Sequence, residues 1–230
     1  MNTFDRPKAA RRTVLAGLAG LGAASLGIAH PARAAGAACV RALSFTPGPF
    51  PLSTILGDPH FRRRSIVEGR GGVPLELLVT VVDAKDACRP IDNAAVYIWH
   101  CDKDGVYSGY DNATGLTFLR GVQATDARGT ASFATIYPGW YPGRITHVHL
   151  QVFVANDLGR RAALTTQVPF PLETSAEVYA SPLYARHGQN GSVRGFEDDG
   201  VFEGKQVQSL MPVMTGSASR GLMARVTIAV

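Results

Sequence analysis

Several common catalytic signatures are missing from this 230-residue sequence. It has no Gly-x-Ser-x-Gly motif, no phosphate-binding P-loop and no dinucleotide-binding glycine pattern. None of its three cysteines lies beside a clear catalytic partner in the sequence. These absences argue against a serine hydrolase of the nucleophile-elbow type, a P-loop nucleotide hydrolase, a Rossmann dehydrogenase and a cysteine-based enzyme.

The sequence also lacks a long amphipathic helix and internal repeats. It has about seven short segments that alternate in polarity or are rich in β-forming residues, separated by turn signals. They are residues 74–83, 94–101, 118–125, 130–136, 147–154, 163–168 and 222–230. The pattern is typical of an antiparallel β-sandwich or barrel, and we predict an all-β sandwich with long irregular loops and little helix.

The segments between these strands give further expectations. Residues 126–129, Asp-Ala-Arg-Gly, predict a hairpin that joins strands 118–125 and 130–136. Residues 171–200 are polar and Gly-rich and are expected to be irregular. We expect residues 35–72 to form an extended N-terminal arm lying over the core, and residues 73–230 to form the sandwich domain.

Residues 1–34 predict an export signal. Arg11-Arg12 precede an apolar run, residues 14–29, that is too short and too rich in Gly and Ala to span a bilayer, and Ala32-Arg33-Ala34 is a cleavage pattern. The paired arginines favour the twin-arginine route, with an ordinary secretory signal or an uncleaved anchor as alternatives. We therefore expect a periplasmic or extracellular protein.

The excess of positive charge lies in that signal. The chain has 23 basic and 18 acidic residues, of which five basic and one acidic precede residue 35, which leaves 18 and 17 and a net charge of about +1. This near-neutral balance gives no reason to expect a nucleic-acid partner, or membrane binding once the signal is removed.

Export would place the cysteines in an oxidising compartment, where disulfides persist. Cys88 and Cys101 flank the strand predicted over residues 94–101, and we expect these two to form a disulfide. Cys39 is then left over as a free, disulfide-bonded or lipidated residue, although the residues before it form only a weak lipidation pattern.

The most informative stretch ends as a strand at residues 147–154. Successive side chains of a strand point to opposite faces, so one face carries Val148, Leu150, Val152 and Val154 and the other carries His147, His149, Gln151 and Phe153. The first face suits a core, and the second aims two imidazoles in one direction. A Pro/Gly-rich turn with tyrosines and an arginine lies directly upstream. Two parallel histidines beside these groups predict a metal site.

The donor types narrow the choice of metal. Zinc usually takes three or four His, Cys or carboxylate ligands, and a copper electron-transfer site includes a cysteine. Of the histidines beyond residue 34, only His147 and His149 lie together. Tyrosine ligands favour a hard, oxidised metal, because a phenol with a pKa of about 10 binds as phenolate only where a strong Lewis acid lowers that pKa. Two histidines and two tyrosines therefore suit Fe(III).

Four other residues compete for roles in this site. Tyr110 and Tyr137 are alternative tyrosine ligands by position alone, and aromatic residues beside Pro/Gly turns are more often packing residues than ligands. His100 follows Trp99 on an alternating strand and is expected to be structural. His187 lies in a Gly-rich loop and is expected to be solvated.

Two segments of the sequence resemble a known family. Residues 94–110 contain Asp104-Gly-Val-Tyr107, and residues 135–149 contain Trp140-Tyr-Pro142 followed by His147-Val-His149. Together they resemble the intradiol ring-cleavage dioxygenases, which include catechol 1,2-dioxygenases and protocatechuate 3,4-dioxygenases. The resemblance covers roughly residues 39–205 and is closer to the exported branch of that superfamily. It implies one Fe(III) per chain, a catecholic substrate and O2.

The resemblance also implies a set of ligands. Tyr107 falls at the first tyrosinate ligand of the family, and Tyr141 falls at the second, which is displaced when substrate binds. His147 and His149 fall at the two histidine ligands.

Further positions match residues around the family's substrate. Arg144 matches the arginine that faces the bound ring, although it can equally cap a turn. Gln167 matches a glutamine near the iron-bound oxygens. Residues 46–50 look like the family's Thr-x-Gly-Pro segment near the pocket, with Pro47 in place of an acidic residue often found there.

The sequence departs from the well-known enzymes in two places. Only five residues separate Tyr141 from His147, a shorter connection than in many of them, and the N-terminal helical segment through which catechol-cleaving members dimerise is absent. Substrate contacts and oligomeric state therefore do not transfer.

The function implied by the resemblance is that of a non-haem Fe(III) intradiol dioxygenase that opens a catecholic ring to a muconate-type diacid. A secreted β-sandwich module that binds aromatic or carbohydrate ligands without catalysis is the alternative. A copper or zinc enzyme using His147 and His149 is a third hypothesis.

Overall fold

The computed structural model describes residues 39–230, so the predicted export signal lies outside the described residues. The strands are β1 (Pro74–Asp83), β2 (Arg89–Pro90), β3 (Ala95–Trp99), β4 (Arg120–Ala124), β5 (Thr130–Ile136), β6 (His147–Phe153), β7 (Leu164–Pro169), β8 (Val213–Ser217) and β9 (Gly221–Ala229). The helical elements are α1 (Leu172–Tyr179) and the 3-10 turns η1 (Ser53–Gly57), η2 (Pro59–Phe61), η3 (Asp111–Ala113), η4 (Val154–Asn156), η5 (Phe196–Asp198) and η6 (Val207–Leu210). In the described part, no helix is long and apolar enough to cross a lipid bilayer.

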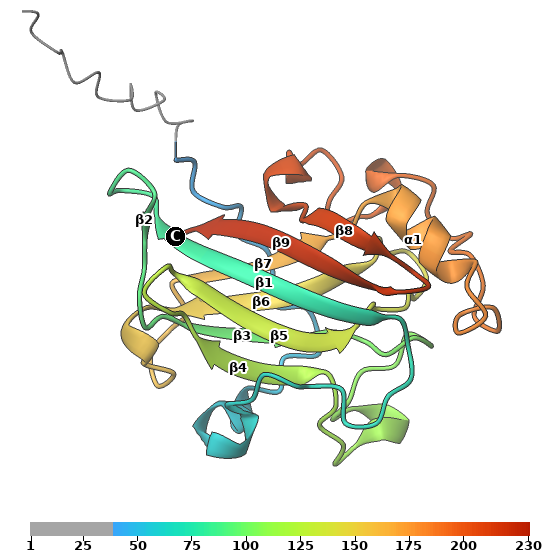
Figure 1. Cartoon of the computed structure of the whole chain (residues 1–230), viewed down its shortest axis with the longest axis horizontal. Coiled ribbons are helices and arrows are strands. Elements are labelled where there is room, and N and C mark those ends of the chain that lie inside the picture. The colour runs from blue at the N-terminus through green and yellow to red at the C-terminus, as the bar shows by residue number, and fades with distance from the viewer. Residues whose placement is uncertain (1–38) are drawn as a thin grey trace, which may run out of the picture. The chain divides into compact units, whose positions relative to one another are not determined.

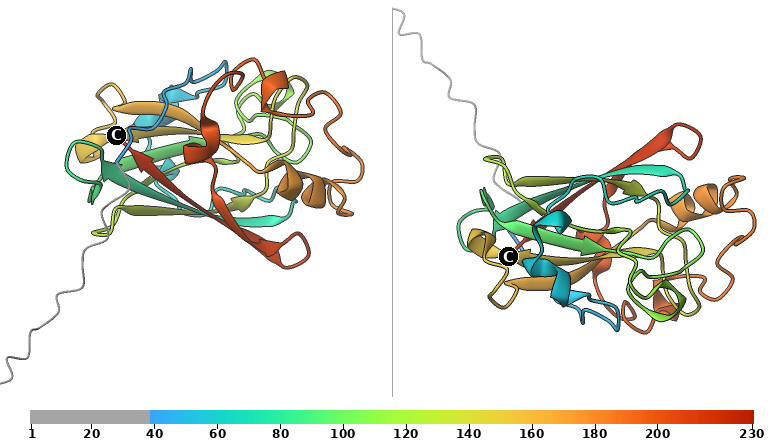
Figure 2. Two further views of the ribbon diagram at one scale, coloured as in Figure 1. Left: turned by 90° about the horizontal axis from the view of Figure 1, so that it is seen from above. Right: turned by 90° about the horizontal axis from the view of Figure 1, so that it is seen from below.

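The strands form two sheets packed face to face (Figure 1). Sheet I has the order β2-β1-β9-β8, with β5 also paired to β1, and sheet II has the order β4-β3-β6-β7. In Figure 1, sheet I lies in front of sheet II and α1 lies beside one end. Figure 2 shows the β8–β9 hairpin projecting beyond the two layers. The predicted all-β sandwich with little helix is confirmed, and one pair, β1 with β9, is parallel.

Aliphatic side chains from both sheets fill the space between them. Alternate residues of β1 and β6 supply much of this core, as their sequence pattern predicts: Leu75, Leu77, Val79, Val81, Val148, Leu150 and Val152. Removal of this apolar surface from water contributes about 25 cal/mol per Å² and is the main stabilising term. Val154 does not belong to the ridge, because the strand ends at Phe153 and Val154 opens η4 with its side chain exposed.

The predicted hairpin of residues 118–136 is wrong in its pairing. Its turn forms, since Asp126 accepts hydrogen bonds from the N–H groups of Arg128 and Thr130, both at 2.9 Å. The two strands then diverge, and β4 pairs with β3 in sheet II whereas β5 pairs with β1 in sheet I. The turn is therefore a corner between the sheets, and Gly129 allows it, because a Cβ there would lie 2.6 Å from the carbonyl oxygen of Val81.

The predicted Cys88–Cys101 disulfide is also wrong. Cys88 is bonded to Cys39, with a Cα–Cα distance of 5.4 Å, and Cys101 is a buried free thiol 3.6 Å from the carbonyl oxygen of Gly139. Cys88 and Cys101 lie beyond opposite ends of β3, and a five-residue strand is about 16 Å long, more than twice the reach of a disulfide. Two cysteines at opposite ends of one strand are therefore too far apart to form a disulfide.

The arm before β1 covers the outer face of sheet II. Near its start, the N–H of Ala42 donates to the Ala229 carbonyl of β9 and the N–H of Phe45 donates to the Thr165 carbonyl of β7, both at 2.9 Å, so the arm first contacts sheet I and then sheet II. In both views of Figure 2 this blue segment lies along sheet II, on the side away from β1. Consequently all five residues of β3 and six of the seven residues of β6 are buried, whereas residues of β1 alternate between buried and partly exposed.

Candidate metal centre

His147 and His149 lie on the outer face of β6, opposite the aliphatic ridge. β6 is an inner strand of sheet II, and its pairing places His149 between Trp99 of β3 and Gln167 of β7. Both imidazoles are almost fully buried, with 2% and 1% of their surface exposed. The period-two pattern of the sequence therefore correctly predicts two imidazoles on one face of a strand.

Tyr107 is held by the tight turn that follows β3. The Asp102 carboxylate accepts hydrogen bonds from the N–H groups of Asp104 and Val106 at 3.0 and 2.9 Å, and the N–H of Asp102 donates to Val106 at 2.8 Å. These bonds fix the loop conformation, so the ring of Tyr107 projects from a rigid turn and is only 5% exposed.

Tyr141 reaches the same place because two loops dock backbone against backbone. Gly105 has a positive φ of 82°, and a Cβ on it would lie 2.4 Å from the carbonyl oxygen of Trp140. The N–H of Gly139 donates to the carbonyl oxygen of Asp102 at 3.0 Å. Only glycine permits this approach at residue 105, which explains how tyrosines 34 residues apart come together.

The polar atoms of the four residues form a closed group. His147 Nε2 lies 3.1 Å from His149 Nε2, and His149 Nε2 lies 3.1 Å from Tyr107 Oη. Tyr107 Oη lies 3.5 Å from Tyr141 Oη, which lies 3.2 Å from His147 Nε2. The structure thus brings together all four residues predicted as ligands. The described residues contain no comparable cluster of three or more His, Cys, Asp and Glu side chains.

The two imidazole rings are oriented by different contacts. His147 donates from Nδ1 to the carbonyl oxygen of Ile145 at 2.6 Å, so the lone pair of the neutral ring is on Nε2. His149 stacks on Trp99, with ring centroids 4.9 Å apart and planes within 4°. The Nδ1 atom of His149 is buried with no hydrogen-bond partner among the described residues. Both Nε2 atoms therefore point to the centre of the group.

Burial keeps these four groups neutral when no metal is bound. Burial, followed by the nearby Arg144 charge, lowers the pKa of His147 to about 3, and burial lowers the pKa of His149 well below its usual value. Burial likewise raises the pKa of Tyr107 well above its usual value and raises that of Tyr141. Neutral imidazoles are the form that binds metal, and the phenols need a Lewis acid to become phenolates.

The donor set and its spacing fit a metal ion. Donors about 2.0–2.1 Å from a central ion, at right or tetrahedral angles to one another, lie about 2.8–3.4 Å apart. Three of the four separations, 3.1, 3.1 and 3.2 Å, lie in this range, and the fourth, between the two tyrosine oxygens, is 3.5 Å. Two neutral nitrogens and two potential phenolates suit a hard trivalent cation such as Fe(III), because two phenolates offset most of its charge.

Arg144 borders this group and is held by a residue that sequence reasoning missed. Its Nε lies 3.0 Å from both carboxylate oxygens of Asp199, which is fully buried. Its other nitrogens lie 3.4 Å from Tyr141 Oη and within hydrogen-bonding distance of Gln167 Oε1. Asp199 also accepts from the N–H of Ile145 at 2.7 Å. Arg144 and Gln167 therefore lie at the site, although their predicted roles remain predictions.

Arg120 is a second residue that sequence reasoning missed. It is fully buried and donates to neutral oxygens: Ser108 Oγ at 2.8 Å, the Ser108 carbonyl at 2.6 Å, the Phe50 carbonyl at 2.8 Å and Tyr97 Oη at 3.2 Å. One guanidinium thus ties β4 to the arm, to the Tyr107 loop and to β3. Nothing local in the sequence distinguishes it from a surface arginine of an edge strand.

The arm completes the wall of the site. Gly48 has a positive φ of 70°, and a Cβ there would lie 3.2 Å from His149 Cε1. Phe50 stacks on Tyr107, with centroids 4.6 Å apart and an interplanar angle of 21°. Gln167 donates to the carbonyl oxygen of Thr46 at 3.2 Å. The segment of residues 46–50 therefore contacts both halves of the group.

The remaining candidates lie outside the group. Tyr137 bonds Ser175 at 2.7 Å in the core and Tyr110 donates to Pro51 at 3.0 Å, so neither is a ligand candidate. His100 is structural as predicted, since its ring lies 2.8 Å from both the Cys101 carbonyl and Thr135 Oγ1. His187 is not fully solvated, because it is half-buried and donates to the Trp140 carbonyl at 2.7 Å.

Two cavities lie near the site. The first, which we call the aromatic cavity, has a volume of about 320 Å³ and is lined by Phe50, Tyr107, Tyr110 and Tyr141. Asp111, which is exposed to solvent, also lines it. It is contiguous with the group through the two tyrosines.

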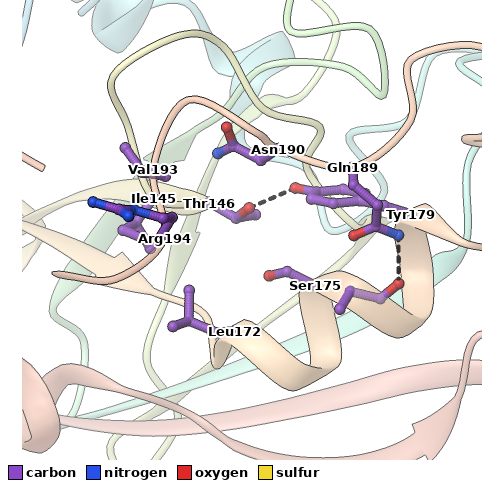
Figure 3. A pocket seen from close by; sticks show the side chains of 10 residues that line it. Ile145, Thr146, Leu172, Ser175, Tyr179, Gln189, Asn190, Val193 and Arg194 are labelled. Atoms are coloured by element: carbon purple, nitrogen blue, oxygen red, sulfur yellow. Dashed lines mark hydrogen bonds between the residues drawn. The ribbon is translucent and has the colours of Figure 1, made fainter. Parts of the chain in front are cut away.

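The second cavity, of about 330 Å³, lies beside α1 (Figure 3). None of the four converging residues lines it. On its wall Tyr179 is hydrogen-bonded to Thr146, immediately before His147. This contact supports the start of β6 from behind.

Comparisons with known proteins identify the family of the chain. A family model described as Dioxygenase matches residues 62–177, half of the chain. An intradiol ring-cleavage dioxygenase from Tetranychus urticae is 28% identical with a TM-score of 0.72, over 83% of this chain and 94% of that chain. The dioxygenase domain of a dioxygenase carbohydrate-binding protein fusion from Streptomyces sp. SirexAA-E is 25% identical with a TM-score of 0.57, over 83% and 98%.

A more distant structure shares the fold alone. Hydroxyquinol 1,2-dioxygenase from Pseudomonas putida DLL-E4 is 19% identical with a TM-score of 0.57, over 82% of this chain and 66% of that chain. A search of curated protein sequences found no match. The family model, the sandwich fold and the similarity to solved dioxygenase structures together show that this chain belongs to the intradiol ring-cleavage dioxygenases.

Proposed function

We propose that the protein is a non-haem Fe(III) dioxygenase that opens a catecholic ring between its two hydroxylated carbons. The observation that carries this proposal is the closed group of two imidazole nitrogens and two phenol oxygens, separated by 3.1–3.5 Å. The product is a muconate-type diacid that contains both atoms of O2, so the reaction balances without an external reductant such as NADH.

Tyr107, Tyr141, His147 and His149 would hold one Fe(III) per chain. When bound, this ion lowers the pKa of the phenols and of the catechol hydroxyls and makes the chelated ring electron-rich toward O2. Tyr107 is the more deeply buried of the two tyrosines and stacks on Phe50, so it would be the ligand that stays bound. Tyr141 is less buried, and an Arg144 nitrogen lies 3.4 Å from its oxygen, so it would be the ligand that gives way to substrate.

The protein supplies proton transfer and charge stabilisation around the substrate. Tyr141 Oη accepts one catechol proton as it becomes a neutral phenol again, and the guanidinium of Arg144 lies 3.4 Å from that oxygen. Arg144 stabilises the negative charge that develops on the substrate oxygens, an electrostatic contribution of a few kcal/mol in sites of this kind. Gln167, bonded to Arg144 and to the arm, orients these oxygens.

The proposal is tested by colour, metal content and oxygen uptake. Tyrosinate-to-Fe(III) charge transfer is expected to make the purified protein red to burgundy, with about one iron per chain. Oxygen uptake with a panel of catechols should give diacids that contain both oxygen atoms from 18O2, as measured by mass spectrometry. A protein that stays colourless after iron reconstitution points to a binding module, and stoichiometric copper or zinc points to a different metalloenzyme.

We also propose that the protein is exported. The predicted signal in residues 1–34 supports this, and so does the Cys39–Cys88 disulfide, because disulfides persist in oxidising compartments. Fractionation of expressing cells, followed by N-terminal mass spectrometry, tests it. We expect a periplasmic or secreted chain that begins after Ala34, and a cytoplasmic chain that retains Met1 would contradict the proposal.

A further inference from the structure

The aromatic cavity is larger than one catechol ring requires. A cavity of about 150 Å³ is enough for a benzene molecule, whereas this one has about 320 Å³ and adjoins the proposed metal ligands Tyr107 and Tyr141. A ring chelated at the metal would therefore direct a substituent into free space. The cavity is thus a candidate for the part of the substrate that decides specificity.

Its walls are aromatic and are held in place. Phe50 stacks on Tyr107 and makes an edge contact with Tyr110, with centroids 5.2 Å apart and planes at 70°. Tyr110 donates its hydroxyl proton to Pro51 at 3.0 Å, and the Phe50 carbonyl is held by Arg120. Fixed aromatic faces and edges bind planar aromatic groups favourably.

The charges around the cavity disfavour an anion. Among the described residues that line it, Asp111 is the one charged side chain. Arg144 contacts Tyr141 and Arg120 contacts Phe50, but Arg144 is already engaged by Asp199, and Arg120 by four oxygens while fully buried. Lys103, two residues before Gly105, is paired with Asp104. A carboxylate on the substrate would meet Asp111 and no available guanidinium or ammonium among the residues that line the cavity.

We propose that the aromatic cavity binds an uncharged aryl substituent, so that the preferred substrates are aryl-substituted catechols without a carboxylate. The proposal rests on the ring-cleaving function proposed above. It assigns the recognition of the substituent to Phe50, Tyr110 and Asp111, none of which is a proposed metal ligand.

Binding and turnover are measured on the iron-loaded protein with three probes: catechol, 4-phenylcatechol and protocatechuate. Dissociation constants come from calorimetry under nitrogen, and turnover comes from oxygen uptake. Burial of a second ring should make 4-phenylcatechol bind roughly tenfold more tightly than catechol. Protocatechuate, with its carboxylate, should bind more weakly than catechol.

Two variants and a matched control sharpen the test. Asp111→Asn removes the charge and suits the positive φ of 46° at this position; it should improve protocatechuate binding roughly threefold relative to catechol binding. Val106→Trp fills the cavity and should abolish the preference for 4-phenylcatechol over catechol. Glu173→Gln, exposed on α1, removes one acidic charge elsewhere and should change none of the three constants.

The outcomes separate the two proposals. Catechol cleavage with protocatechuate binding as tightly as 4-phenylcatechol overturns the specificity proposal and leaves the ring-cleaving function standing. If Asp111→Asn leaves the ratio of the protocatechuate and catechol dissociation constants unchanged, the proposed role of the Asp111 carboxylate is overturned. If none of the three probes is cleaved by protein that contains iron, the ring-cleaving function itself fails.

Discussion

The two sheets of the sandwich share one core but differ on their outer faces. In sheet I, residues of β1 and β9 alternate between buried and more exposed positions, as in a sheet with one face toward water. In sheet II, β3 and β6 are buried on both faces, because the arm and the loops after β3 and β5 cover the outer face. The proposed metal ligands lie under this cover. The outer face of sheet II therefore carries polar side chains shielded from water, whereas sheet I contributes mainly to stability.

Removing a ligand from the covered face should have the largest effect. His149→Gln keeps a polar side chain but loses the imidazole nitrogen at the centre of the group, so we expect less than about 1% of wild-type ring-cleaving activity and loss of the charge-transfer band. Metal content and oxygen uptake measure this. Arg225→Gln on the exposed face of β9 is the control and should change stability by less than about 0.5 kcal/mol. Equal losses in both variants would remove the distinction between the faces.

The buried Arg144–Asp199 pair should be the next most sensitive feature. Asp199→Asn removes the carboxylate bonded to Arg144 and leaves this mostly buried cation, 16% exposed, without its partner. It should lower the free energy of unfolding by about 3–5 kcal/mol. It should also reduce kcat more than KM, because Arg144 would no longer be held beside Tyr141. Urea unfolding and steady-state kinetics measure the two effects.

The neighbouring Asp198 provides the matched control. It pairs with Arg194 on the surface at 3.7 Å, so Asp198→Asn should leave both stability and kinetics at wild-type values. A stable, fully active Asp199→Asn variant would show that the buried pair has no part in positioning Arg144.

The local pattern of the sequence predicts the individual strands of this molecule but not which strands pair. Alternation is a property of consecutive residues, so β1 and the imidazole pair of β6 could be read directly. The Asp126–Gly129 turn was also correctly predicted as a turn. The sequence predicts that the strands on either side of this turn, β4 and β5, pair with each other. Their true partners lie in different sheets, which the local pattern does not show.

The missed residues of the site have the same explanation. Asp199 follows two other acidic residues in an irregular segment. Its partner Arg144 lies 55 residues earlier, so its burial depends on a contact that the local sequence does not show. Arg120 makes four hydrogen bonds, all to residues that lie 12 to 70 positions away in the sequence. The predicted ligand set comes from residue types and an order that resemble a family, because spacing alone does not bring Tyr107 to Tyr141.

The disulfide links the two regions and should have a smaller effect on function than on stability. Cys39–Cys88 closes a loop across 49 residues and anchors the covering arm to the β1–β2 turn of sheet I. Loop-closure entropy gives about 4 kcal/mol for such a bridge, with measured values of about 2–4 kcal/mol. Cys88→Ser should lower the free energy of unfolding by this amount and retain ring cleavage at low temperature.

Peptide mapping without reduction checks the pairing itself. A Cys39–Cys88 peptide is expected, together with an unmodified Cys101 peptide after labelling of the denatured protein. A Cys88–Cys101 peptide would contradict the structure and would require the end of β3 to be rebuilt.

The last comparison concerns acid and distinguishes buried histidines on the two sides of sheet II. Burial lowers the pKa of His100, which lies between the sheets and bonds Thr135, to about 4, against about 6.5 in an unfolded chain. The unfolded state therefore binds a proton that the folded state does not bind as the pH falls from about 6.5 to about 4. Stability is fully present above this window and is lost within it, at up to about 1.4 kcal/mol per pH unit for each such histidine.

In the metal-free protein His147 and His149 should add to this slope, because burial also lowers their pKa values. Urea unfolding of the metal-free protein between pH 4.5 and 7 should then show a loss of stability steeper than one histidine alone would give. His100→Gln should reduce the slope by one proton in either form, since His100 lies away from the group on the covered face. A slope that is identical in the metal-free wild type and in His100→Gln would show that His100 is protonated in the folded protein.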